Sequence, residues 1–107
     1  MAIARMSTRT GNPHGQLWLG RSGASHLLIP LVLDTFMLDA SLTLLARGSN
    51  VLWVGSMAEV VEDAASRARF RLALASADRA FALDRVVEPS ERGELIFDLE
   101  GASPLAA

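Results

Sequence analysis

The stretch FMLDASLTLLARGSN, residues 36 to 50, carries the clearest structural pattern of the chain. Its even positions from 36 to 46 are all apolar, whereas its odd positions include three polar residues: Asp39, Ser41 and Thr43. Alternation with a period of two is typical of a strand that has one buried and one solvated face. Gly48-Ser49-Asn50 is typical of a hairpin turn. We therefore predict a strand over 36–47 that turns back into a second strand over 50–54.

The same alternation predicts three more strands, over 67–75, 79–87 and 94–100. The segment 26–33 is interpreted as a further strand. Pro30 places this strand at an edge or a bulge. In the sequence RARFRLALA, a strand puts the three arginines on one face, whereas a helix would turn Arg69 toward the apolar side. This interpretation therefore excludes a continuous helix through Phe70.

A short helix or loop is expected over 57–66, before the strand predicted at 67–75. Ser56 and Glu59 have the spacing of a capping box, in which each side chain bonds the backbone N–H of the other residue. Six strands with short connections indicate an all-β domain, a small antiparallel β-barrel with this short helical insert. Closure of the barrel would hide the strand edges.

At 107 residues the chain is long enough for one domain, which we place at 1–107 with a basic N-terminal arm at 1–15 and a loose tail at 101–107. Trp18 and Trp53 are expected in packing roles. The predicted core consists of the residues on the more apolar face of each strand: Phe36, Leu38, Leu42, Leu44, Phe70, Leu72, Leu74, Phe81, Leu83, Leu95, Phe97 and Leu99.

The charges of the chain are unevenly distributed. All ten basic residues are arginine, and those within residues 1–26 occur there without any acid, whereas 88–100 is strongly acidic. The formal net charge of −2 argues against a nucleic-acid partner. The longest apolar run, 27–33, is too short to span a membrane as a helix. The chain has no cysteine, which agrees with a reducing cytoplasm as its location.

No catalytic or cofactor motif stands out in the sequence. His14 and His26 lack the ligand spacing of a metal site, and there is no nucleophile elbow or glycine-rich phosphate loop. We therefore expect neither an enzyme nor a bound metal or cofactor. The remaining clue is a pair of short patterns, Arg5-Met-Ser-Thr-Arg9 in the arm and Asp39-Ala-Ser41 in the opening stretch.

These two patterns resemble the motifs of the PilZ domain, a small six-stranded barrel that commonly binds cyclic di-GMP. That family carries Arg-x-x-x-Arg in an N-terminal arm and [Asp/Asn]-x-Ser-x-x-Gly at a later strand; Leu44 stands here where the family has glycine. The resemblance implies that Arg5 and Arg9 contact a cyclic dinucleotide together with Asp39 and Ser41. It also admits a degenerate form of the domain that acts only through protein contacts.

Two other interpretations remain open. Asp39, Ser41 and Thr43 would equally form the solvated face of a strand, with the basic arm as a tail. The chain would then be a structural or adaptor barrel with a protein partner, such as a subunit of a larger assembly of the phage head–tail type. In that case the arginines at 67, 69 and 71 would face acidic groups of the partner.

Overall fold

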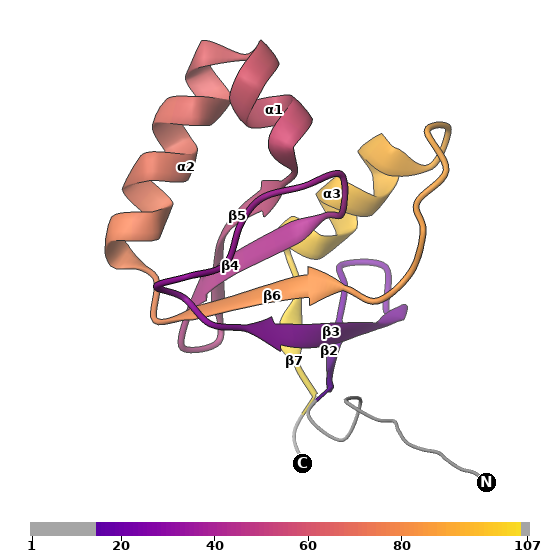
Figure 1. The fold of residues 1–107 in the computed structure, drawn as a ribbon. Helices are drawn as coiled ribbons and strands as arrows, with labels where there is room; N and C mark the ends of the chain where they lie inside the picture. The colour runs from indigo at the N-terminus through magenta and orange to yellow at the C-terminus, as the bar shows by residue number, and fades with distance from the viewer. Residues whose placement is uncertain (1–14, 106–107) are drawn as a thin grey trace, which may run out of the picture.

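The structure is a computed structural model that describes residues 15–105. Within that range the chain forms a sheet of six strands and three helices (Figure 1). The strands are β2 Gln16–Leu19, β3 Ser25–Leu31, β4 Thr43–Arg47, β5 Asn50–Gly55, β6 Arg79–Leu83 and β7 Ser103–Pro104. The helices are α1 Met57–Glu62, α2 Ala64–Ser76 and α3 Arg92–Glu100.

All strand pairs of the sheet are antiparallel, in the order β5-β4-β6-β3-β2-β7. β6 joins the β4–β5 hairpin to the β2–β3 hairpin, so the two hairpins become one sheet. The sheet curls into a half-barrel that does not close. The prediction of a mainly antiparallel β-sheet domain is therefore confirmed, and that of a closed barrel is not.

The two faces of the sheet bury separate apolar clusters. On one face, Trp18 and Phe81 meet edge to face with their ring centroids 5.4 Å apart, and α3 covers them. On the other face, Trp53 packs against Phe70 of α2 with centroids 4.8 Å apart. Figure 1 shows the result, with α2 at the left, α3 at the upper right and the sheet between them. Both tryptophans are buried packing residues, as the sequence predicts.

The prediction of a strand over 67–75 is wrong. This segment belongs to the helix α2, which runs through Phe70. Asp63 caps the helix by accepting the N–H groups of Ala65 and Ser66, both at 3.3 Å. The helix turns only a narrow stripe toward the sheet, which contains Ser66, Phe70 and Ala73. Arg69 therefore lies beside this stripe and stays exposed, so the helix does not bury the arginine as the strand argument assumed.

The prediction of a strand over 94–100 is also wrong, because this segment belongs to the helix α3. Leu95 and Leu99 are four residues apart, so they lie on the same face of a helix as well as of a strand. Both are buried in the first cluster, whereas Phe97 between them is 61% exposed. The alternating pattern was therefore compatible with both structures, and burial against Trp18 selected the helix.

The hairpin at the opening stretch is confirmed in its second half only. β4 begins at Thr43, and residues 36–42 form an irregular segment instead of the predicted strand start. The β4–β5 turn is as predicted, and Gly48 in it has the positive φ of 60° that glycine tolerates. The strand predicted over 26–33 spans 25–31, and that predicted over 79–87 ends at 83.

The predicted core is confirmed at six positions: Leu42, Leu44, Phe81, Leu83, Leu95 and Leu99. Phe36, Leu38 and Phe70 are half-buried against the second cluster. The prediction is wrong for three residues that are exposed on the helices, namely Leu72, Leu74 and Phe97. In the segment expected to be a loose tail, Ser103–Pro104 pairs with β2.

Candidate functional site

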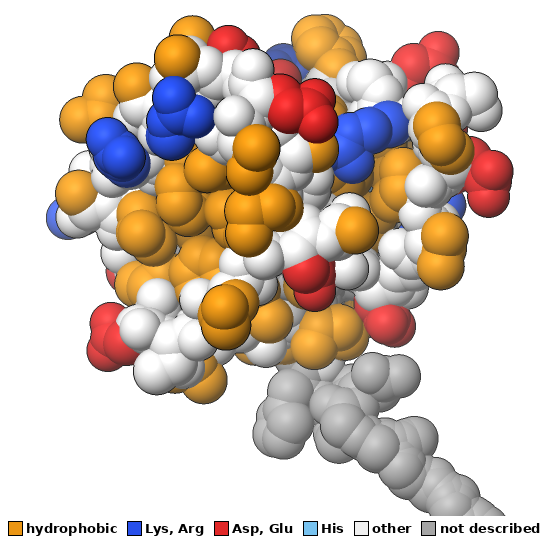
Figure 2. All heavy atoms as spheres, turned by 45° about the horizontal axis from the view of Figure 1, so that its top comes forward, with side chains coloured by type: hydrophobic (Ala, Val, Ile, Leu, Met, Phe, Trp, Pro, Cys, Tyr) orange, Lys and Arg blue, Asp and Glu red, His pale blue; other side chains and the backbone are white. Residues whose placement is uncertain are grey.

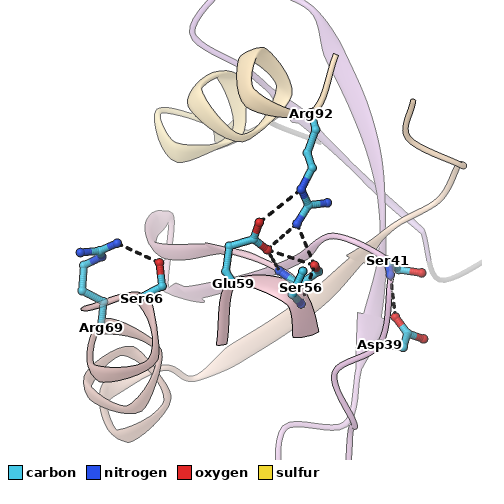
Figure 3. Close-up of polar contacts among 8 residues, drawn as sticks. Asp39, Ser41, Ser56, Glu59, Ser66, Arg69 and Arg92 are labelled. Carbon is cyan, nitrogen blue, oxygen red and sulfur yellow. Dashed lines mark hydrogen bonds and ion pairs between the residues drawn. The ribbon is translucent and has the colours of Figure 1, made fainter. Parts of the chain in front are cut away.

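The four residues of the predicted ligand site do not all lie in the described structure. Arg5 and Arg9 lie outside the described residues. Asp39 and Ser41 are exposed in the irregular segment before β4, where Asp39 Oδ1 accepts the backbone N–H of Ser41 at 2.8 Å (Figure 3). The backbone carbonyl of Asp39 also accepts the N–H of Met57 at the start of α1. One carboxylate oxygen is thus used in a local turn instead of projecting from a strand.

A groove of about 450 Å³ lies beside Ser41. Its walls come from the segment before β4, the segment after β6 and the first residue of α3: Ala40, Ser41, Leu83, Asp84, Arg85, Val86, Val87 and Arg92. Small-molecule sites range from about 300 to 1,000 Å³, so the groove has a suitable size for a ligand. Whether the groove can bind an anion depends on whether Arg85 and Arg92 are already paired with carboxylates of the fold.

Arg92 is held by two residues of the α1 cap (Figure 3). Its Nη2 donates to Ser56 Oγ at 2.7 Å and to Glu59 Oε1, and its Nε donates to Glu59 Oε2 at 3.2 Å. Glu59 accepts the backbone N–H of Ser56 at 2.7 Å as well, which completes the capping box that the sequence predicts. The cluster thereby joins α3 to α1 across 33 residues of sequence.

The contacts with Arg92 and Ser56 lower the pKa of the Glu59 carboxyl. Partial burial raises the pKa of its carboxyl, but hydrogen bonds from Arg92 and Ser56 outweigh burial and hold it below its ordinary value. About a quarter of each of the Glu59 and Arg92 side chains remains exposed. The charge of Arg92 is therefore already matched by a carboxylate within the fold.

Arg85, the second arginine of this groove, is paired in the same way. Its Nη2 lies 2.7 Å from Glu91 Oε1, and its Nη1 donates to Glu91 Oε2 at 3.2 Å. The hydrogen bond from Arg85 and one from the backbone N–H of Glu88 lower the pKa of Glu91 to about 2. Asp84 adds a further acid to the wall. Among the described residues, this groove consequently offers no unmatched arginine to an anion.

A second polar cluster, which the sequence interpretation missed, encloses the carboxylate of Asp98. Asp98 Oδ2 lies 2.7 Å from His26 Nε2, and Oδ1 accepts the backbone N–H of Ser22 at 2.7 Å. The bond from His26 chiefly holds the pKa of Asp98 below its ordinary value. A Cβ at Gly20 would overlap the Asp98 carboxylate. The turn GRSGAS, residues 20–25, therefore packs closely against Asp98, which is 72 residues from His26 in the sequence.

This pair does not form a nucleophile–base arrangement within the described residues. The His26 and Asp98 side chains are only 9% and 13% exposed, and no serine or threonine hydroxyl of residues 15–105 bonds the imidazole. A nucleophile within hydrogen-bond reach of its base is the signature of covalent catalysis. The Asp98 cluster instead attaches α3 to the β2–β3 hairpin. The glycines at 20 and 101 leave room for the Asp98 and Arg21 side chains, but no pattern in the sequence links them to this cluster.

A larger groove of about 780 Å³ runs along α3. It is lined by Arg21, Ser22, Glu91, Gly93, Glu94, Leu95, Phe97 and Asp98. The guanidinium of Arg21 stacks over the Phe97 ring at 4.5 Å from its centroid, and its Nε donates to the Phe97 carbonyl at 3.0 Å. One face of an otherwise exposed aromatic ring is thereby fixed in position.

The most prominent surface feature is the α1–α2 face, which we define by α1, α2 and the adjoining segment 32–38. Four large apolar side chains on it are exposed by more than 60%: Val32, Met37, Val61 and Leu72. Figure 2 shows apolar side chains gathered on this side of the molecule, with arginines beside them at the left, over α2. Arg71 of α2 is exposed and bonds no other described residue.

Within residues 15–105 no helix is long and apolar enough to cross a membrane, and no cluster of acidic and histidine side chains could hold a metal ion. The chain matches no protein-family model, no curated protein and no solved structure.

Proposed function

We propose that this chain is a small non-enzymatic binding or adaptor domain that works through protein contacts at its α1–α2 face. The observation that supports the proposal is the concentration of exposed Val32, Met37, Val61 and Leu72 on that face. Single exposed apolar residues are common, but a contiguous apolar group rimmed by charges is typical of an interaction site. Methionine and arginine are also enriched in protein interfaces.

The charge of α2 defines the chemistry of the partner. Residues 64–76 contain three arginines and no acid. Arg67 caps α1 by donating to the Val60 carbonyl at 2.8 Å, and Arg69 donates to Ser66 Oγ at 3.0 Å. The acceptors of both bonds are uncharged. Arg69 also lies near Asp63, whose carboxyl pKa is lowered chiefly by the hydrogen bond from Ser66 and further by this charge. Arg67 and Arg71 therefore carry the charge that remains for a partner. The partner surface is therefore acidic at its rim and apolar at its centre.

Site-specific cross-linking tests this proposal. A photoreactive amino acid is placed at Leu72 or at Met37, and the full chain is irradiated in the cells that naturally produce it. Val86 is the matched control, because it is as exposed as Met37 but belongs to the segment between β6 and α3. We expect a discrete protein adduct at Leu72 and Met37 and none at Val86. Equal labelling at all three positions, or no adduct at all, would refute the proposal.

A cyclic dinucleotide is the second candidate partner, in line with the resemblance to PilZ. The observation that favours it is the groove of about 450 Å³ beside Ser41. Both arginines of the groove are paired within the fold, so Arg5 and Arg9 of the arm would supply the unpaired cations. Charge-assisted bonds to phosphate are worth roughly 1.5–3 kcal/mol each. Removal of either arginine would then weaken binding about tenfold or more.

Calorimetric titration with cyclic di-GMP, with GTP as the control ligand, tests this second candidate. We expect heat from cyclic di-GMP only, a tenfold or greater loss in Arg5→Ala, and little change in Thr8→Ala. The Ser41→Ala variant reports on the groove itself. Absence of heat at high ligand concentration would remove the nucleotide and leave the protein-contact proposal in place.

A further inference from the structure

The exposed side of α2 is a basic helix face with an apolar centre. Leu72 is 72% exposed. Successive helix residues are about 100° apart, so Arg71 and Arg69 lie on either side of Leu72. The other exposed positions nearest to Leu72 hold only small side chains, the alanines at 65, 68 and 75 and Ser76, which leave Leu72 as the main projection. The helix therefore presents one large apolar side chain between two arginines.

The groove along α3 has the opposite character. Three carboxylates line it, those of Glu91, Glu94 and Asp98, beside the cation of Arg21. Glu91 is already paired with Arg85 and Asp98 with His26, so Glu94 is the carboxylate that remains for a partner. Glu94 forms no hydrogen bond or ion pair with any described residue. Phe97 supplies an exposed apolar surface that Arg21 holds in place. At Gly93 no atom lies within 4 Å of the position that a Cβ would take, so this part of the groove is open.

The residues of α2 and those that line the groove carry formal charges of opposite sign, and both surfaces belong to one chain. We propose that the groove along α3 receives α2 of a second copy, with Leu72 against Phe97 and the arginines of α2 facing the carboxylates of the groove. The inference rests on the proposed function, because it names the partner of the α1–α2 face. Aromatic anchors near the centre of an interface typically supply most of its affinity.

The geometry of this contact determines the kind of assembly. The helix and the groove are different surfaces, so each contact is head-to-tail and leaves one free helix and one free groove on the complex. Growth continues until a ring closes, or it forms open chains. Ion pairs at the rim are screened by salt, so the assembly weakens as ionic strength rises.

Sedimentation velocity of the full chain measures this assembly, with two complementary variants. The helix variant carries Arg71→Glu and Leu72→Glu, and the groove variant carries Gly93→Arg and Glu94→Arg. All four positions are exposed, and a side chain at Gly93 meets no neighbour, so both variants are expected to fold, as circular dichroism will verify. The controls are Arg79→Glu and Glu88→Arg, which change the charge at exposed positions outside both surfaces.

We expect the average mass of the unchanged chain to rise with concentration and to fall when salt is added. Each variant alone should associate at least about tenfold more weakly. An equimolar mixture of the two variants should form a dimer and stop there, because the intact groove of one binds the intact helix of the other. The control variants, alone or mixed, should behave as the unchanged chain does.

Three results would overturn the inference: a monomer at every concentration in low salt, variants that associate as the unchanged chain does, or a variant mixture that stays monomeric. A monomeric chain whose Leu72 cross-links to a different protein would overturn self-association and leave the proposed function standing. A monomeric chain without any adduct at Leu72 would overturn both.

Discussion

The junction between α1 and α3 gives the sharpest stability prediction, through the substitution Glu59→Gln. Glu59 has two roles, because it accepts the backbone N–H of Ser56 in the capping box and pairs with Arg92 of α3. Glutamine also serves in a capping box, so the first role survives the substitution. The substitution removes the charge that faces Arg92 and replaces the oxygen that accepts the Arg92 Nε–H by an NH2 group. The variant therefore isolates the ionic link between the two helices.

The expected loss follows from the exposure of the pair. A hydrogen bond to a charged group contributes about 1.5–3 kcal/mol when buried, and a fully exposed ion pair about 0.2–1 kcal/mol. The Glu59 and Arg92 side chains are 26% and 25% exposed, which lies between these limits. We expect Glu59→Gln to lower the free energy of unfolding by about 1–2 kcal/mol. For a domain of this size that corresponds to a fall in Tm of roughly 5–15 °C.

The pH dependence has a definite sign. Because the pKa of Glu59 in the folded chain lies below its ordinary value of 4.5, the unfolded chain takes up the proton first as pH falls. The stabilisation is thus fully present above pH 4.5 and is lost as the pH falls through the folded pKa. The difference in stability between the unchanged chain and Glu59→Gln should be largest near pH 7 and should close in acid.

Urea denaturation followed by circular dichroism, at pH 7 and at successive values below 4.5, measures both effects. Glu59→Ala serves as the comparison, because it also removes the cap and should lose about 1 kcal/mol more. The reasoning fails if Glu59→Gln matches the unchanged chain at pH 7, or if the difference persists undiminished in acid. It also fails if the alanine and glutamine variants are equally stable, since the cap would then contribute nothing.

Three further predictions follow from burial and hydrogen bonding. Phe81→Ala should lower the free energy of unfolding by about 3–5 kcal/mol, because Phe81 is buried against Trp18, whereas Phe97→Ala should lower it by less than about 1 kcal/mol; equal losses in urea denaturation would contradict the assignment of the buried face. Asp98→Asn should destabilise the chain at pH 7, and because His26 and Ser22 lower the pKa of Asp98, this difference should shrink as pH falls below its ordinary value; a pH-independent difference in Tm would show that the charge is unimportant. Leu44→Gly should lower the free energy of unfolding by at least about 3 kcal/mol, because Leu44 is buried in the first cluster; an unchanged Tm would contradict that placement.

The sequence by itself determined the features that depend on neighbouring residues. The β4–β5 turn follows from the Gly48-Ser49-Asn50 sequence, and the α1 cap follows from the spacing of Ser56 and Glu59. Such signals involve residues a few positions apart, so the chain needs no distant partner to express them. The antiparallel character of the sheet followed from the same local patterns.

Tertiary packing decided what those patterns left ambiguous. Leu95 and Leu99 suit a strand or a helix equally, and only burial against the sheet makes 94–100 a helix. Likewise, 67–75 forms a helix because the sheet requires only a narrow apolar stripe from it. Period-two alternation in short segments overlaps with the i, i+4 spacing of helices, so it cannot separate the two structures.

The polar junctions were the least accessible to sequence reasoning, because their members are far apart along the chain. Arg92 meets Glu59 across 33 residues, and Asp98 meets His26 across 72. No local pattern marks such a pair, since each charged residue alone looks like part of a solvated surface. The two arginines of the groove beside Ser41 became matched by carboxylates only when α3 docked on the sheet. In the structure both of these arginines are paired with carboxylates of the fold, whereas Arg71 of α2 stays exposed.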